Sequence, residues 1–301
     1  PSQPAEQTAV DQDKRNRDAG SGGNPPGDTW ADGLPQGRRW SGIAWSLLFL
    51  LVPVLGTATF VIAPYYDHWL PKDVSVHGRS IDDLFYFILV LTGVIFLATE
   101  LILFWFMWKY DAAASSKPAT YIHGSHALEV VWTIIPAATM LFLAIYQMNT
   151  WADIKMRRPR MSPSAEVVAR QFEWRIRYPG RDETLGTPDD LFVVNDLHVP
   201  VDEDFLIQLK SMDVLHSFFL PNLRMKQDAV PGMKQPVWFK ATQTGTYDIV
   251  CAEVCGWGHY KMKGRVTIES RADFDRWLAR IEAEQKATQR GPDEIPMAAA
   301  D

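Results

Sequence analysis

The stretch CAEVCGWGHYKM, residues 251–262, contains the only two cysteines of this 301-residue chain. Cys255 follows Cys251 by four positions, His259 follows by four more, and Met262 by a further three. Thiolate, imidazole and thioether ligands together suit copper, whereas structural zinc sites are built from cysteine and histidine. The spacing therefore predicts a metal-binding loop that other parts of the fold must hold in shape.

A further imidazole is expected from outside this loop. The segment DVLHSFFLP, residues 213–221, offers His216 shortly after the strand-like run FLIQLK. Two neighbouring loops of a β-sandwich would then supply every ligand, and Gly256 and Gly258 would let the second loop turn tightly. The alternatives are a disulfide between the two cysteines and a packed core histidine at position 216.

Composition limits the class of protein. Lysine and arginine number 30 and aspartate and glutamate 36, so the formal charge of −6 argues against nucleic acid as a partner. The 12 tryptophans and 15 phenylalanines cluster at the ends of apolar runs, as in the aromatic belts of membrane proteins.

Three apolar runs are long enough to cross a bilayer core of about 30 Å. Residues 41–64 are predicted as a first transmembrane helix, although a basic pair ahead of the run also allows a signal-like segment. Residues 81–148 are predicted as a transmembrane helical hairpin, with Asp82 and Asp83 at the start of its first helix.

The remaining segments differ in texture from these runs. Residues 1–40 are rich in Pro, Gly, Asp, Gln and Ser and are predicted as a disordered or extended tail. Residues 151–270 contain short alternating or β-branched runs between turn residues, which predict a β-sandwich or barrel. Here His198 falls in a predicted turn and is interpreted as structural. Residues 271–301 are predicted as a C-terminal helix and tail, with Ser270 as the N-cap.

Positive charges alone do not settle the orientation in a membrane. Two lysines, Lys109 and Lys117, lie between the second and third apolar runs, whereas Lys155 and the arginines at positions 157, 158 and 160 follow the third. Counting them would place the β-rich domain in the cytoplasm, but the rule weakens where a long folded domain follows.

With these motifs in view, the chain resembles subunit II of the haem–copper cytochrome c oxidases over residues 80–270. CAEVCGWGHYKM matches the family's C-x-E-x-C-G-x-x-H-x-x-M, DVLHSFFLPNLRMKQDAVPG matches the loop with its first histidine ligand, and LEVVWTIIPA matches the start of its second conserved membrane helix. The resemblance implies a membrane-anchored α+β fold. A transmembrane helical hairpin, here with an extra N-terminal transmembrane helix, would precede a cupredoxin-like β-sandwich on the outer side of the membrane.

The resemblance also implies the ligands of a dinuclear copper centre called CuA. Cys251 and Cys255 would bridge both coppers. His216 and His259 would each bind one copper, and Met262 would be a weak axial ligand.

Further roles follow from the same resemblance. Glu253 would bind copper through its backbone carbonyl, and its side chain would help to hold Mg²⁺ shared with subunit I. Phe172 occupies the position of the family's tryptophan at which electrons enter, and Trp174 follows it. Glu129 matches a glutamate near the mouth of a proton path into subunit I, although a carboxylate in the first turn of a helix can also be structural.

The function implied is that of the electron-accepting subunit of an aa3-type cytochrome c oxidase. It would take electrons from a c-type cytochrome and pass them to haem in subunit I, where oxygen reduction is coupled to proton pumping. The implied partners are subunits I and III, membrane lipid and the cytochrome, without nucleic acid. The implied location is the bacterial plasma membrane, crossed several times, with the copper domain on the periplasmic side.

Two further expectations concern the donor and the competing function. Opposite charges interleaved over residues 170–204 would cancel a steering field, which favours a donor held by a membrane anchor or in a supercomplex. The alternative function is a membrane-tethered copper chaperone, since such proteins also combine C-x3-C with a distant histidine.

Overall fold

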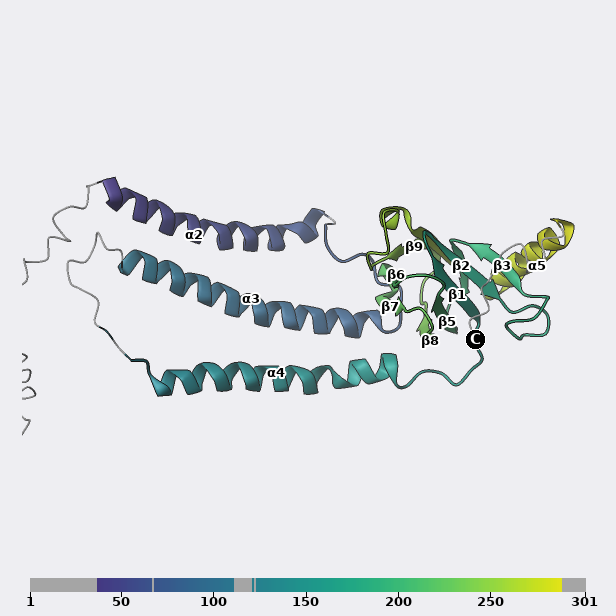
Figure 1. Ribbon diagram of the computed structural model, residues 1–301, viewed down its shortest axis with the longest axis horizontal. Coiled ribbons are helices and arrows are strands. Elements are labelled where there is room, and N and C mark those ends of the chain that lie inside the picture. Colours follow the sequence, from purple (N-terminus) through teal and green to yellow (C-terminus); the bar gives the residue numbers. More distant parts are fainter. Residues whose placement is uncertain (1–36, 67, 111–120, 122, 289–301) are drawn as a thin grey trace, which may run out of the picture. The chain divides into compact units, whose positions relative to one another are not determined.

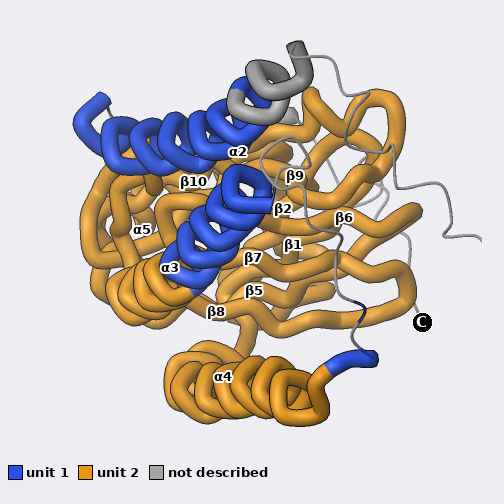
Figure 2. Tube along the Cα trace, turned by 90° about the vertical axis from the view of Figure 1, so that its left-hand side faces the viewer, with its two compact units in different colours: residues 1–67, 92–124 blue, residues 68–91, 125–301 orange. Residues whose placement is uncertain are grey.

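The computed structural model describes residues 37–66, 68–110, 121 and 123–288 (Figure 1). Residues 1–36 and 289–301, which hold most of the predicted N-terminal tail and the end of the predicted C-terminal tail, lie outside the described residues. The chain divides into two compact units, residues 1–67 with 92–124 and residues 68–91 with 125–301 (Figure 2).

Three described helices are long and apolar enough to cross a membrane, namely α2 (Gly37–Ile62), α3 (Gly78–Lys109) and α4 (His126–Lys155). The short 3-10 helix η1 (Ala63–Tyr66) extends the first of these spans. Exposed leucine, isoleucine, valine and phenylalanine side chains cover all three, as expected of helices that face lipid. The three predicted apolar runs are therefore helices long and apolar enough to cross a membrane, and α2 continues through Pro53.

The start of α3 is fixed by the β-rich domain rather than by acidic residues in its first turn. The helix begins at Gly78, so the prediction that Asp82 and Asp83 mark its start is wrong. Asp82 instead accepts two hydrogen bonds from Arg224, from Nε at 2.7 Å and from Nη2 at 2.9 Å. Both side chains are largely buried, and such a bidentate pair fixes orientation as well as distance.

The segment that precedes α3 is also built into the domain. The Val74 amide donates to the Asn222 carbonyl and its carbonyl accepts from the Thr242 amide, each at 2.9 Å. Val74 is fully buried, and Ser75 forms a β-bridge with Ala241. The outer end of α3 is therefore fixed by both backbone pairing and an ion pair.

The β-rich domain is a sandwich of two five-stranded sheets (Figure 1). The first sheet has the order β3 (Leu191–Val194), β2 (Glu173–Tyr178), β1 (Ala165–Arg170), β5 (Asp204–Ser211) and β8 (Gln235–Lys240). The second has the order β4 (Asp196–Pro200), β10 (Lys263–Glu269), β9 (Gly245–Cys251), β6 (His216–Leu220) and β7 (Met225–Ala229), with the 3-10 helix η2 (Pro221–Leu223) between β6 and β7. The core between the sheets includes Trp174, Phe218 and Ile249, all fully buried. The predicted cupredoxin-like sandwich is confirmed.

Three strands were not evident from the sequence pattern. His198 lies in β4 and pairs with Thr267 of β10, so its placement in a turn is wrong. The pattern failed because β4 ends at Pro200, β6, with the sequence HSFFL, does not alternate polar and apolar residues, and β7, with the sequence MKQDA, is largely polar.

Helix α5 (Arg271–Thr288) closes the end of the sandwich at which β2 finishes. The Asp273 amide donates to Ser270 Oγ at 3.2 Å, as predicted for the N-cap. Trp277 packs edge-on against Tyr178 with ring centroids 5.2 Å apart and stacks on His198 at 4.0 Å.

His198 has a structural role in this packing. Its ring nitrogens lie 2.7 Å from Glu269 Oε1 and 3.4 Å from Asp196 Oδ2. Burial disfavours the charged imidazolium, but the two carboxylates outweigh burial and raise the pKa of His198 above its usual value. The structural interpretation of this histidine is therefore consistent with its contacts.

Candidate metal centre

Strand pairing brings the two predicted ligand segments together. Strands β6 and β9 pair antiparallel with Phe218 opposite Cys251 and Phe219 opposite Val250. His216, the first residue of β6, therefore lies beside Cys251, the last residue of β9. Residues 251–262, called the metal loop from here on, connect β9 to β10, and the Cys251 amide closes the loop by donating to the Met262 carbonyl at 3.2 Å.

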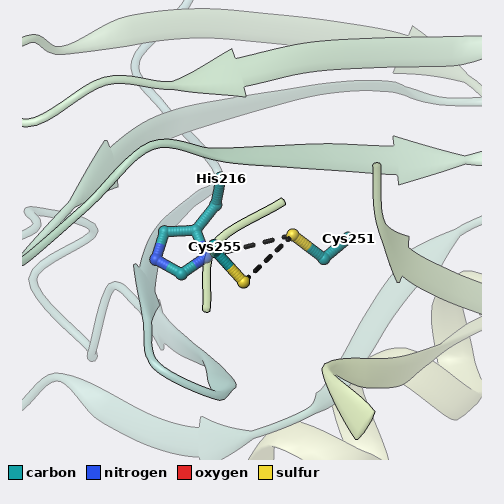
Figure 3. A group of neighbouring side chains, drawn as sticks. All are labelled: His216, Cys251 and Cys255. Atoms are coloured by element: carbon teal, nitrogen blue, oxygen red, sulfur yellow. Dashed lines mark hydrogen bonds between the residues drawn. The ribbon is translucent and has the colours of Figure 1, made fainter. Parts of the chain in front are cut away.

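The five predicted side-chain ligands converge on one point. Cys251 Sγ lies 3.9 Å from both Cys255 Sγ and His216 Nδ1 (Figure 3). Met262 Sδ lies 3.1 Å from His216 Nδ1 and 3.8 Å from Cys255 Sγ. His259 Nδ1 lies 3.6 Å from Cys255 Sγ. His216, Cys255 and Met262 are buried, with 0%, 4% and 1% exposure, so the site excludes most water.

This donor set fits a soft metal. The ligand atoms of His216, Cys251 and Cys255 all lie within 4.8 Å of one another. Two metal–thiolate bonds of about 2.3 Å span at most roughly 4.6 Å, so sulfurs at the observed separation can bind one ion together. Both cysteines are free, and 3.9 Å is far beyond a disulfide bond of about 2.05 Å. The alternative of a disulfide is therefore absent from this structure.

The metal loop is shaped by its contact with Gln171 and Phe172. Gly256 has φ of 140°, a conformation that only glycine adopts readily. A Cβ atom at Gly258 would clash with the Phe172 ring, so both glycines serve the close approach of this segment. Gln171 Nε2 also donates to the Cys255 carbonyl at 2.5 Å. The predicted tight turn is therefore held by a partner outside the loop.

Sequence reasoning missed Asp213, although it stands only three residues before His216. Its Oδ1 lies 2.8 Å from His216 Nε2, while the other ring nitrogen, Nδ1, faces the sulfurs. A carboxylate on the distal nitrogen of a metal-binding histidine fixes the tautomer and raises the basicity of the ligand. Asp213 also accepts from the Gln171 amide at 2.8 Å, which links the histidine to the segment under the loop.

The two thiols differ in how readily they ionise. Burial opposes ionisation of Cys251, but hydrogen bonds, led by that with His216, lower its pKa to about 6. Burial and the nearby charge of Cys251 raise the pKa of Cys255 to about 11. The second thiol therefore needs a cation before it can lose its proton at neutral pH.

The other predicted residues occupy three different positions. Trp174 is fully buried, with its ring centroid 6.2 Å from that of His216, while Phe172 is only partly buried. Glu253 has an exposed side chain, and its carbonyl lies 3.3 Å from Cys251 Sγ. Glu129 is not part of this cluster, because it lies in the first turn of α4.

Fold and site together define a class of protein. Three membrane-capable helices precede a cupredoxin-like sandwich, and the sandwich holds a soft-ligand metal site. Two family models match the part of this arrangement that follows α2: the transmembrane domain of cytochrome c oxidase subunit II at residues 65–150 and its periplasmic domain at residues 171–270. The chain belongs to the cytochrome c oxidase subunit II family. It is a membrane-anchored subunit of a haem–copper oxidoreductase, with a periplasmic domain, and this replaces the copper-chaperone alternative.

Individual relatives agree with the family models. "Alternative cytochrome c oxidase subunit 2" of Bradyrhizobium diazoefficiens is 29% identical over 78% of this chain and 91% of its own length. "Cytochrome c oxidase subunit 2" of Thermostichus vulcanus is 27% identical over 71% and 79%. Among solved structures, the periplasmic domain of subunit II of cytochrome oxidase of Bradyrhizobium japonicum is 25% identical, covers 42% of this chain and 97% of its own, and has a TM-score of 0.38.

The thiol pKa values predict which cysteine reacts first in the metal-free, full-length chain. At pH 7 iodoacetamide should modify Cys251 well before Cys255, because Cys251 with a pKa of about 6 is mostly thiolate and is also the more exposed. The rate at Cys251 should fall about tenfold per pH unit below pH 6, as the thiolate is protonated. Peptide mass spectrometry over a time course measures both rates. Earlier modification of Cys255 would contradict the prediction.

Proposed function

We propose that this chain is the electron-accepting subunit of its oxidase and holds a dinuclear copper centre in the metal loop. The convergence of two thiols, two imidazoles and a thioether carries the proposal. Cys251 and Cys255 would both bind the copper pair, and their separation of 3.9 Å suits a shared site. His216, His259 and Met262 would supply two imidazole ligands and one thioether ligand.

When bound, the copper pair accepts single electrons from a c-type cytochrome and yields them to haem in subunit I. The protein holds the ligands rigidly and excludes most water from the site. Asp213 and the β6–β9 pairing hold His216 in one orientation, and Met262 is buried beside it. Ligands that cannot move keep the geometry similar in both oxidation states, so little reorganisation accompanies electron transfer.

Glu253 supplies the remaining ligand in this proposal. Its carbonyl oxygen, 3.3 Å from Cys251 Sγ, lies close enough to serve as an axial ligand. Its side chain is exposed and therefore free to share Mg²⁺ with subunit I. Carboxylate oxygen is the type of ligand that Mg²⁺ prefers.

Metal analysis of the assembled oxidase tests both metal proposals. The wild type should hold two coppers per copy of this chain and show a mixed-valence EPR spectrum. Cys251→Ser or Cys255→Ser should abolish that spectrum, whereas Met262→Leu should keep both coppers and shift only the potential, since an axial thioether binds weakly. Glu253→Gln should retain both coppers, through its backbone carbonyl, but lose Mg²⁺. A single copper in fully loaded wild-type protein would sink the dinuclear proposal.

Glu129 fits a role on the opposite side of the membrane. It lies in the first turn of α4, half-exposed, with His126 as its nearest ionic neighbour at 3.8 Å. The other end of α4 is held by the sandwich, where Trp238 Nε1 donates to the Ile154 carbonyl at 2.8 Å. About 26 residues at 1.5 Å each separate the ends by roughly 39 Å, more than the bilayer core. With the sandwich in the periplasm of a bacterium, Glu129 faces the cytoplasm, where protons are taken up.

Exchange of Glu129 for Ala should slow proton delivery without changing electron uptake. We expect stopped-flow reduction of the copper centre at the wild-type rate and reduction of the subunit I haems slowed at least severalfold. Glu129→Asp, which keeps the carboxylate, should recover part of the rate. Unchanged turnover in Glu129→Ala would return this residue to the role of a carboxylate that stabilises the helix N-terminus.

The charges predicted to shape donor docking are paired. Arg177 bonds to Glu166 and lies 3.3 Å from Asp190, and Arg181 lies 2.8 Å from Glu282. Arg181 and Asp190 follow the end of β2 that is remote from Phe172, and Arg177 lies next to that end; the six residues of this strand span roughly 17 Å. The field of these charged groups at the metal loop is therefore weak, which supports a donor held by a membrane anchor or in a complex.

Turnover with a soluble basic cytochrome c should accordingly be slow and nearly independent of ionic strength. A donor held in the same membrane should be oxidised fast under the same conditions. The measurement is oxygen consumption from about 10 to 200 mM salt, a range over which screening of a steering field is large. A fast rate at low salt that collapses as salt rises would defeat the proposal.

A further inference from the structure

Trp257 is the most exposed large hydrophobic side chain of the metal loop. It is 84% exposed, and Val254 and Tyr260 of the same loop are 79% and 66% exposed. Single exposed large apolar residues are common on protein surfaces. Here three of them lie within the twelve-residue metal loop, and such a group suits contact with a protein partner.

We propose that Trp257, rather than Phe172, is the side chain through which electrons reach the metal loop. The inference rests on the proposed function, because it concerns the donor to the same site. Trp257 stands two residues after Cys255 and two before His259, both of them proposed ligands. Its indole is therefore joined to the Cys255 sulfur by about ten covalent bonds.

Phe172 acts as the support for this tryptophan. The two rings are 5.3 Å apart between centroids and meet edge to face at 70°. Phe172 is partly buried, and its ring fills the space that the absent side chains of Gly256 and Gly258 leave. The metal loop therefore partly covers the Phe172 ring. Trp257, which packs against that ring, forms the exposed surface at this point.

The charges near Trp257 fit an apolar contact rather than an ionic one. The metal loop carries one carboxylate, Glu253, and one ammonium group, Lys261, which lies 5.5 Å from the Tyr260 ring centroid. Asp213 is engaged with His216 at 2.8 Å. The partner that matches this surface is a c-type cytochrome whose haem edge is ringed by apolar side chains.

The electron count of the step is simple. One electron leaves the ferrous haem of the cytochrome, which becomes ferric, and one electron is gained at the copper centre. Trp257 shortens the gap between them and is itself neither oxidised nor reduced. No proton or leaving group moves in this step.

The test compares Trp257→Ala, Trp257→Phe and Phe172→Ala in the intact oxidase, with Val194→Ala as a control for loss of an exposed apolar side chain on β3. Stopped-flow absorbance follows reduction of the copper centre by a reduced c-type cytochrome and, in parallel, by hexaammineruthenium(II), which needs no docking surface. We expect Trp257→Ala to slow the cytochrome reaction at least tenfold and the ruthenium reaction less than twofold. Trp257→Phe should recover most of the rate, Phe172→Ala should be intermediate, and Val194→Ala should match the wild type.

A binding measurement supplies a readout that does not need copper. Isothermal titration of the metal-free full-length chain with the oxidised cytochrome should give a dissociation constant at least fivefold higher for Trp257→Ala than for the wild type. A wild-type rate and affinity in Trp257→Ala, or a larger loss in Phe172→Ala, would overturn the inference. Failure of the wild type to bind copper would instead overturn the proposed function, and the titration would still show whether Trp257 contributes to binding of the cytochrome.

Discussion

The pairing of β6 with β9 is the constraint on which the site depends. Its register sets Phe218 opposite Cys251 and so brings His216 to the first thiol of the metal loop. A shift of one residue would turn His216 and Phe218 to the other face of the sheet, because side chains alternate along a strand. The buried core residues on both strands, Phe218 and Ile249, resist such a shift. Packing of apolar side chains thus determines a metal–ligand geometry.

The same strand connects the site to the membrane anchor. β6 and β7 form a hairpin whose open end carries His216, and whose closed end leads through η2 to Arg224. Arg224 binds Asp82 of α3, and Asn222 pairs with the segment before that helix. The ligand His216 is thus connected to the start of α3 through β6, a strand of five residues. Such a connection suits a protein that must deliver electrons to a partner within the membrane.

The segment Gln171–Phe172 and the metal loop are shaped to fit each other. Phe172 lies against Gly256 and Gly258, Gln171 binds the Cys255 carbonyl, and Asp213 links the Gln171 amide to His216. The residues around the centre therefore support one another through hydrogen bonds and ring contacts. The smaller ring of Phe172 and the larger ring of Trp257 pack against each other and fill this surface.

The sequence alone determined the elements whose physics is local. The three apolar runs had to be helices that face lipid, Ser270 had to cap α5, and the spacing of Cys251, Cys255, His259 and Met262 indicated a soft metal. The sequence also offered His216 as a further ligand, and the family resemblance supported that role. What only the tertiary structure decided depends on contacts between distant segments. The sequence pattern predicts Asp82 as a helix start, whereas in the structure it binds Arg224, which is 142 residues away in the sequence. The pattern predicts His198 as a turn residue, whereas in the structure it lies in β4 and pairs with β10. Nothing in the sequence distinguishes Trp257 from other loop residues, and only the fold brings it into contact with Phe172. Each depends on which distant segments the fold brings together, and this is settled by packing of the whole core rather than by any local pattern.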